Sequence, residues 1–219
     1  MPSPARKTLT GSEMGNLDPT LLLVLIACLY ILVFGGMSFL RREGLSVQFA
    51  LEVVALSILL IGGAWLSGIA LNPILFLLIL YLVTMRSRLI VDVANLLVRQ
   101  GQHKAAFTLY RLGLAWWPDP SSRLIVLANR GAAELYCDQV EPAIHTLESV
   151  LKEEKQPGLG LKYEAACRYN LGLAYEAHGE MAKAVQQFNE VIDLLPSSPY
   201  ARAAQAALKR RKKDSSGGG

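Results

Sequence analysis

Two stretches of this chain contain no charged residue, and each is long enough to cross a lipid bilayer. They are residues 21–40 and 53–85. A helix of about 20 apolar residues spans the ~30 Å hydrocarbon core. The second stretch would reach about 50 Å as one straight helix, so it must be interrupted, and the Asn72-Pro73 step favours a turn there. We therefore predict three transmembrane helices, at about 20–40, 47–67 and 73–86.

The first predicted span differs from a cleavable signal peptide in its length and in the residues that follow it. A signal peptide has an apolar stretch of only about 7–15 residues before a small-residue cleavage site. Here the stretch is longer and is followed by Arg41-Arg42, and Asp18-Pro19 before it is a helix start signal. We predict a retained membrane domain at residues 18–86, preceded by a disordered N-terminus at residues 1–17.

The distribution of arginine and lysine predicts the orientation, because cytoplasmic loops carry an excess of these residues. With three spans, Arg41-Arg42 and Arg86-Ser-Arg88 lie on the same side, which places the C-terminal half in the cytoplasm and the N-terminus on the opposite side. With two spans these basic flanks would lie on opposite sides, and this alternative stays open. The charge bias and the absence of a eukaryotic targeting signal favour a multi-pass protein of the bacterial inner membrane.

The residues that carry chemistry are sparse in the water-soluble half. Residues 86–208 contain 13 Lys/Arg and 13 Asp/Glu, so this half is neutral and lacks the basic stripe of a nucleic-acid-binding domain. The histidines and cysteines lack the spacing of metal ligands or of a disulfide framework, and they are His103, His145, His178, Cys28, Cys137 and Cys167. We expect buried free thiols, no metal, no cofactor and no enzyme activity.

Residues 165–198 carry small and aromatic residues at a fixed spacing. The set is Leu171, Gly172, Tyr175, Gly179, Ala184, Phe188 and Pro196. It resembles the tetratricopeptide repeat, a helix–turn–helix unit with a period of about 34 residues. In such a unit small residues lie where the two helices cross, aromatic residues fill the space between them, glycine permits the turn and proline follows the second helix.

The same spacing fits the chain twice more, with substitutions. Residues 87–120 supply Gly101, Ala106, Tyr110 and Pro118. Residues 124–157 supply Gly131 and Ala143, but Glu134 replaces the aromatic residue and Asp138 replaces the turn glycine. One such unit cannot bury its own apolar face, whereas three stacked units can.

The resemblance therefore predicts an all-α protein, in which transmembrane helices are followed by an α-solenoid of about three tetratricopeptide helix pairs. We expect this domain at residues 87–208, with a capping helix at 199–208 and a basic, flexible tail at 209–219. No linker rich in Gly, Pro or Ser separates residues 74–99. We therefore expect the third span to continue into the first repeat as one helix.

In tetratricopeptide proteins the first helices line a concave groove that holds a partner's extended peptide or helix. The resemblance places these residues there: Val91, Asp92, Asn95, Val98, Ile125, Ala128, Asn129, Ala132, Leu135, Tyr169, Asn170 and Leu173. The asparagines would form a ladder of donors and acceptors suited to a peptide backbone, or they bond to neighbouring helices instead. Chaperone-binding members use basic residues where this chain has Val91, Ala166 and Asn170, so we predict no binding of a chaperone tail.

Three further features each leave more than one interpretation. Trp116-Trp117 either packs between repeats or rests on the membrane interface, where Trp is enriched. Glu52 is either a functional acid in the membrane or an interfacial residue. A run of five cations comprises Lys209, Arg210, Arg211, Lys212 and Lys213. It either forms a solvated helix end or contacts anionic lipid, and binding to nucleic acid is the least favoured interpretation.

The pattern as a whole predicts a membrane-anchored scaffold that binds a protein partner at the cytoplasmic face, in the assembly or stabilisation of a membrane complex. The alternative is a small integral membrane subunit, for transport or lipid handling, whose repeats are regulatory. Glu52 and the glycines of the spans favour the alternative, since small residues let membrane helices approach closely. These glycines are Gly35, Gly36, Gly62 and Gly63.

Overall fold

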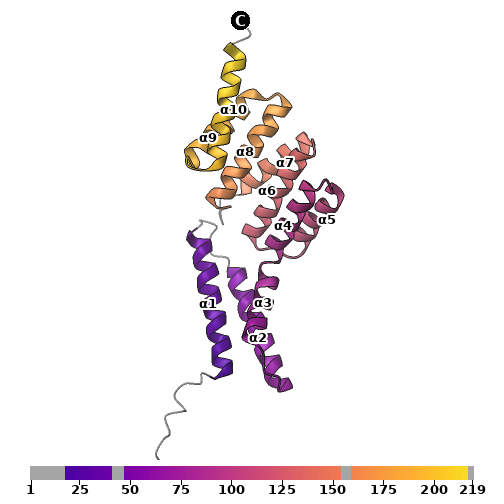
Figure 1. Cartoon of the computed structure of the whole chain (residues 1–219), viewed down its shortest axis with the longest axis vertical. Helices are drawn as coiled ribbons and strands as arrows, with labels where there is room; N and C mark the ends of the chain where they lie inside the picture. Colours follow the sequence, from indigo (N-terminus) through magenta and orange to yellow (C-terminus); the bar gives the residue numbers. More distant parts are fainter. Residues whose placement is uncertain (1–17, 41–46, 154–158, 217–219) are drawn as a thin grey trace, which may run out of the picture.

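The computed structural model describes residues 18–40, 47–153 and 159–216 (Figure 1). In these residues the chain forms ten α-helices and no strand, which confirms the predicted all-α class. The helices are α1 Pro19–Leu40, α2 Val47–Ser67, α3 Pro73–Thr84, α4 Arg86–Arg99, α5 His103–Ala115, α6 Pro120–Tyr136, α7 Val140–Glu153, α8 Leu161–His178, α9 Met181–Leu194 and α10 Pro199–Ser216. The disordered N-terminus predicted at 1–17 and the Arg41-Arg42 loop lie outside the described residues.

Helix starts are encoded by cap residues followed by proline. The Asn72 side chain accepts hydrogen bonds from the backbone N–H groups of Ile74 and Leu75, and Pro73 is the first helical residue. Asp119 caps α6 in the same way, with Pro120 next. A side-chain acceptor satisfies N–H groups that have no partner within the helix. Because of this cap, α6 begins four residues before the predicted repeat start at 124.

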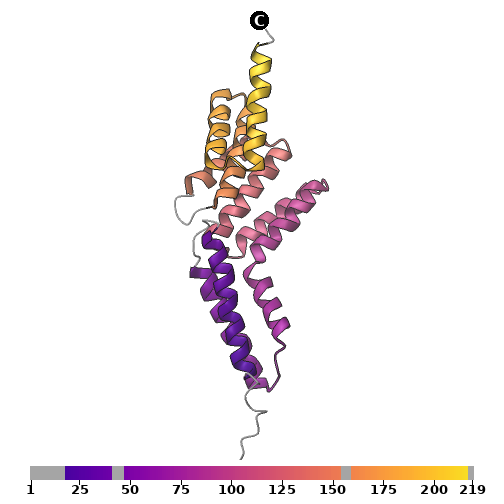
Figure 2. The same cartoon turned by 60° about the vertical axis from the view of Figure 1, so that its left-hand side comes forward.

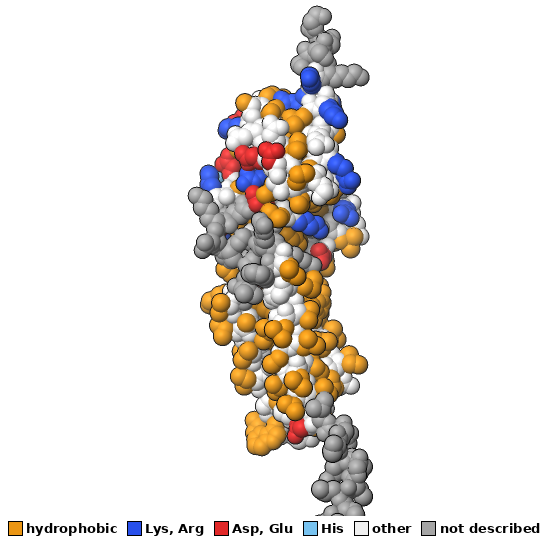
Figure 3. Space-filling view, turned by 90° about the vertical axis from the view of Figure 1, so that its left-hand side faces the viewer, with side chains coloured by type: hydrophobic (Ala, Val, Ile, Leu, Met, Phe, Trp, Pro, Cys, Tyr) orange, Lys and Arg blue, Asp and Glu red, His pale blue; other side chains and the backbone are white. Residues whose placement is uncertain are grey.

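Helices α1, α2 and α3 pack together and expose most of their apolar residues. Their shared core is small, and it comprises Leu23, Ala27, Tyr30, Val53, Phe76 and Leu80. Figure 3 shows hydrophobic side chains covering the visible face of these helices, while Lys, Arg, Asp and Glu gather over the other half of the molecule. Only α1 and α2 are long and apolar enough to cross a membrane among the described helices. With 12 residues, α3 reaches only about 18 Å.

The expected continuous helix from the third span into the first repeat is wrong. Helices α3 and α4 meet at an angle of 69°, and Met85 between them has φ −96° and ψ 10°. The hydrogen bonds on either side are kept, from Met85 N–H to the Tyr81 carbonyl and from Leu89 N–H to the Met85 carbonyl. No glycine or proline marks this bend. It is accompanied by tertiary contacts of Arg86, described below.

The remaining helices form three antiparallel pairs that lie side by side in chain order, beyond one end of α1–α3 (Figures 1 and 2). The pairs are α4 with α5, α6 with α7, and α8 with α9, and α10 packs on the last pair. The first helices also contact one another in order, α4 with α6 and α6 with α8. In the turn of the third pair Gly179 has φ 87°, and Asp138 takes a similar left-handed φ of 61° in the second pair.

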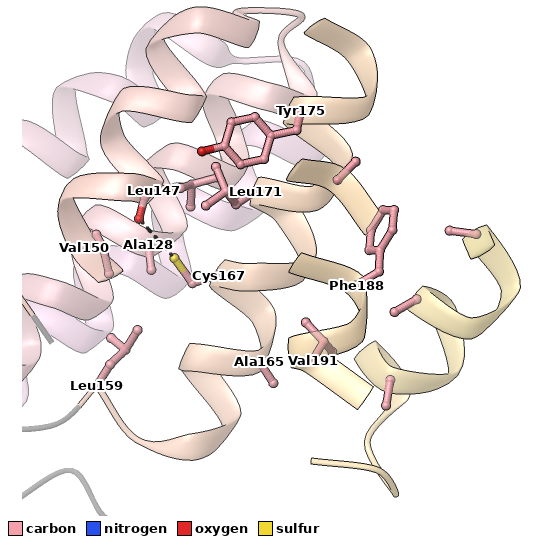
Figure 4. Packing of buried hydrophobic residues seen from close by; sticks show 14 of the residues in the cluster. Ala128, Leu147, Val150, Leu159, Ala165, Cys167, Leu171, Tyr175, Phe188 and Val191 are labelled. Atoms are coloured by element: carbon pink, nitrogen blue, oxygen red, sulfur yellow. Dashed lines mark hydrogen bonds between the residues drawn. The ribbon is translucent and has the colours of Figure 1, made fainter. Parts of the chain in front are cut away.

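Two glycines allow the helices of a pair to cross closely. A Cβ atom on Gly172 would lie 2.6 Å from the Phe188 ring, and one on Gly131 would lie 2.7 Å from Leu147. Figure 4 shows the Phe188 ring in the packed interior of this half, with Leu171 and Tyr175 nearby. The alanines of the repeat pattern are fully buried, and they are Ala106, Ala143 and Ala184. Small residues therefore permit backbones to approach where aromatic or Leu side chains fill the gap.

The basic run does not form a flexible tail, because α10 continues through it to Ser216. Arg210 and Arg211 approach the Glu176 carboxylate of α8, with N···O distances of 3.4 and 3.9 Å. The end of α10 lies at the opposite end of the molecule from α1–α3 (Figure 1). The suggested lipid contact at 209–213 therefore disagrees with this arrangement, since the run cannot reach a bilayer entered by α1 and α2. The Lys213 side chain lies outside the described residues.

Candidate functional site: a groove across α4, α6 and α8

A cavity of about 440 Å³ lies across the first helices of the three pairs. Asn95 of α4, Asn129 of α6 and Asn170 of α8 all line it, and Asp92 lines it one turn before Asn95. Four further predicted groove residues lie there too, and they are Val91, Val98, Ala128 and Ala132. The arrangement places three side-chain amides in a row along one open, partly apolar hollow.

The first two asparagines bind each other, whereas the third has no hydrogen bond to any of the residues that the structure describes. Asn95 Nδ2 donates to Asn129 Oδ1 at 2.9 Å, and Asn129 Nδ2 donates to the Ile125 carbonyl at 2.8 Å. The Tyr110 hydroxyl donates to Asn95 Oδ1, and burial raises the pKa of Tyr110 to about 12. Asn95 and Asn129 therefore line the groove and also join neighbouring helices, whereas binding of a peptide by the asparagine row stays a prediction. Within the described part of the chain, the Asn170 side chain has no hydrogen-bond partner.

Some of the predicted groove residues lie elsewhere. Leu173 packs against the hydrophobic core, as does Tyr169, whose ring faces Phe188 and Tyr200 at centroid distances near 6 Å. Ile125 is buried in the same core. Leu135 is half-buried and does not line the cavity. The groove position expected for Tyr169 from the tetratricopeptide pattern is wrong because α10 packs on α8 and its Tyr200 contacts the Tyr169 ring.

Two cations and three tyrosines line the cavity without having been predicted. The cations are Arg99, at the end of α4, and Lys162, at the start of α8. The tyrosines are Tyr136, Tyr163 and Tyr200. Arg99 and Lys162 lie at helix ends, outside the family's clamp positions, so the family pattern gave no signal for them. A helical projection of α4 and α8 that included their terminal turns would have found both.

A second hollow, of about 280 Å³, continues from the groove toward α1 and α3. It shares Val91, Asp92 and Tyr163 with the first cavity. Its other walls include Met37 of α1 and Tyr81 of α3, the apolar helices. The two hollows therefore adjoin, and the second lies between the asparagine row and the apolar helices.

An arginine joins the apolar helices to the helix pairs. Arg86 makes two parallel hydrogen bonds to the Glu52 carboxylate, at 2.7 and 3.0 Å. Its remaining N–H groups donate to the carbonyl oxygens of Val83, Trp116 and Trp117, at 2.9 to 3.1 Å. All five donors of the guanidinium are thus used. Glu52 is therefore a partner in an ion pair at the junction between the apolar helices and the helix pairs.

The expected set of three buried thiols is wrong in part. Cys167 is buried, but Cys137 is half-buried and Cys28 is exposed on the apolar surface of α1. All three are free. Cys137 Sγ lies 3.2 Å from His103 Nδ1, and burial raises the pKa of this thiol. Among the described residues, no group of His, Cys, Asp and Glu has the arrangement of a metal site.

Comparison with known proteins assigns no family to the chain. No family model, curated protein or solved structure matches it. Any functional conclusion therefore has to come from the geometry of the groove and of its junction with α1–α3.

Proposed function

We propose that this chain is a membrane-anchored scaffold of the tetratricopeptide kind, which holds a segment of a protein partner in the groove of α4, α6 and α8. The observation that supports this most is the row of Asn95, Asn129 and Asn170 along one cavity. Amides offer both donors and acceptors, so they can bond to a peptide backbone whatever its sequence. Tyrosines beside them supply apolar contact area with a polar tip.

The shape of the groove favours a partner that is itself close to the membrane. The hollow continues along Val91, Asp92 and Tyr163 to the edge of α1 and α3. A segment lying in it would emerge beside the apolar helices. We therefore propose that the partner is a membrane protein whose juxtamembrane segment enters the groove, consistent with a role in assembling or stabilising a membrane complex.

For the topology we propose three crossings, with the N-terminus outside and the helix pairs in the cytoplasm. α3 is short, but it packs in one core with α1 and α2. Arg86 and Arg88 then begin the charged half. Protease added outside intact cells should leave the helix pairs uncut, and cleavage of that half would overturn the topology.

The groove is tested by site-specific photo-crosslinking in native membranes. A benzoylphenylalanine at Ala132, which lines the groove, should form an adduct with one partner protein. The same probe at Asn189, which is exposed on α9 and does not line the groove, is the matched control and should form none. Equal adducts from both positions, or none from Ala132, would overturn the proposal.

Asn170 allows a cleaner test than the other asparagines, because it has no bonds to lose within the described residues. Asn170→Ala should weaken partner binding while leaving thermal stability unchanged, since only a ligand would use its amide. Asn129→Ala should lower both, because it also breaks the bond to Asn95. Asn189→Ala should change neither. If Asn170→Ala binds the partner as well as the original chain, the asparagine row is not the docking element.

A further inference from the structure

We infer that Trp117 and Trp65 mark the two faces of the bilayer, with the Trp117 indole resting among lipid headgroups beneath the helix pairs. The inference rests on the proposed crossing of the membrane by α2, and it goes beyond the groove. It assigns a lipid-binding contact to the loop between α5 and α6, far in sequence from the apolar helices.

The first observation is the conformation in which Trp117 is held. Its side chain is 82% exposed, and its φ of 48° is rare for a bulky residue. Its carbonyl oxygen accepts hydrogen bonds from Arg86, at 2.9 Å, and from Gln48 of α2, at 3.1 Å. The protein therefore fixes this backbone unit against the start of α2 while leaving a large apolar ring uncovered.

The second observation is a matching distance along α2. Gln48, which binds the Trp117 carbonyl, and Trp65 lie 17 residues apart on this helix, or about 26 Å at 1.5 Å per residue. The hydrocarbon core of a bilayer is about 30 Å thick, and Trp is enriched at both of its boundaries. Trp65 is also exposed, at 79%. The Trp117 backbone, held at Gln48, and Trp65 are thus separated along α2 by nearly the thickness of the hydrocarbon core.

The third observation is where charge begins. The stretch from Gln48 to Trp65 contains one charged residue, Glu52, and it is paired with Arg86 near the Trp117 end. Beyond this point the surface becomes charged, as Figure 3 shows for one face. Trp116 and Leu112, at the end of α5, are exposed as well. The bilayer boundary therefore falls at the junction, where the Trp117 loop would contact it.

A docked protein is the other occupant that an exposed indole can have, and the experiment separates the two. Three full-length variants each keep one tryptophan and carry Phe at the other two positions. A fourth carries Tyr136→Trp with Phe at all three native positions, since Tyr136 is exposed at the far end of α6. Each variant is reconstituted into phosphatidylcholine vesicles whose acyl chains are brominated either near the headgroup or near the chain end. Circular dichroism confirms that each keeps its helical content.

The variants that keep Trp117 or Trp65 should show blue-shifted emission and lose more fluorescence with shallow bromines than with deep ones. The Tyr136→Trp variant should be quenched by aqueous iodide and not by either lipid. If Trp65 behaves as expected but Trp117 is not quenched by lipid, the headgroup contact is overturned while the anchor stands. If lipid quenches neither Trp65 nor Trp117, both the headgroup contact and the proposed membrane crossing of α2 are overturned. The groove is tested independently by its own crosslinks.

Discussion

The glycines at the crossings of two helix pairs have surroundings opposite to those of the glycines in α1 and α2. In α1 and α2 a Cβ atom on Gly36, Gly62 or Gly63 would meet nothing within 4 Å, whereas one on Gly131 or Gly172 would collide with a neighbouring side chain. The helix pairs are therefore packed against themselves to the limit that backbone approach allows. The apolar helices touch each other through a small core and leave most of their surface for another medium, which we propose is lipid.

This contrast indicates where the stability of each half comes from. In the helix pairs, burial removes apolar surface from water, which is the dominant favourable contribution to folding. Between helices that lipid surrounds, no such transfer occurs, and packing and interhelical hydrogen bonds contribute instead. An example of the latter is the contact between the hydroxyl oxygens of Tyr30 and Thr84, at 2.7 Å.

The largest expected effect comes from removing one buried aromatic ring in each half. Phe188 and Phe76 are both fully buried. Phe188→Ala should lower the free energy of unfolding by about 3–5 kcal/mol. Phe76→Ala should cost clearly less in a bilayer or micelle, because its surroundings are apolar in either state. Urea unfolding of the helix pairs and SDS titration of α1–α3, both on the full chain in mild detergent, measure the two values. Equal losses of unfolding free energy in the two variants would show that both halves are stabilised in the same way.

A smaller effect is expected from adding one methyl group at a glycine in each half. Gly172→Ala places a Cβ atom 2.6 Å from the Phe188 ring, and overpacking of this kind costs about 1–3 kcal/mol. Gly62→Ala meets open space and should change stability by less than about 0.5 kcal/mol. Thermal unfolding of the two variants in one detergent checks this. A large loss at Gly62 would mean that α2 packs closely against a helix of another protein or of a second copy.

The smallest expected effect concerns the arginine that joins the halves. Lysine offers three donors where Arg86 uses five, so Arg86→Lys should lower stability by about 1–2 kcal/mol. Arg123, whose ion pair with Glu153 is about half exposed, is the matched control, and Arg123→Lys should change little. Thermal unfolding followed by circular dichroism measures both. If the two variants behave alike, the junction is held by packing rather than by the guanidinium.

Local chemistry made much of the fold predictable from sequence. Asn72-Pro73 and the uncharged stretches predicted the interruption between α2 and α3, and the small-residue spacing predicted three helix pairs. The bend at Met85 was not predictable, because the local sequence contains no glycine or proline. It accompanies contacts from Arg86 to carbonyl groups 30 residues later in the chain, which no local pattern reveals.

The sequence predicted the groove residues correctly where their position on the face of a single helix is enough to place them. Asn95, Asn129 and Asn170 fall on the inner face of first helices, and all three line the cavity. Tyr169 was misplaced because α10 covers its face of α8. The hydrogen bond between Asn95 and Asn129 depends on how α4 and α6 dock, and residue spacing carries no information about that distance.

If α1–α3 cross a bilayer as we propose, the bend at Met85 also sets how far the proposed docking surface stands from it. One residue separates α3 from α4, and backbone hydrogen bonds continue on both sides of it, so no linker lies between the apolar helices and the helix pairs. A partner segment that starts at the membrane plane would then meet the groove at an effective concentration set by this one-residue connection rather than by linker length. The connection would thus select partners by the distance between their docking segment and the bilayer. Partners whose segment begins too far from the bilayer would not reach the groove.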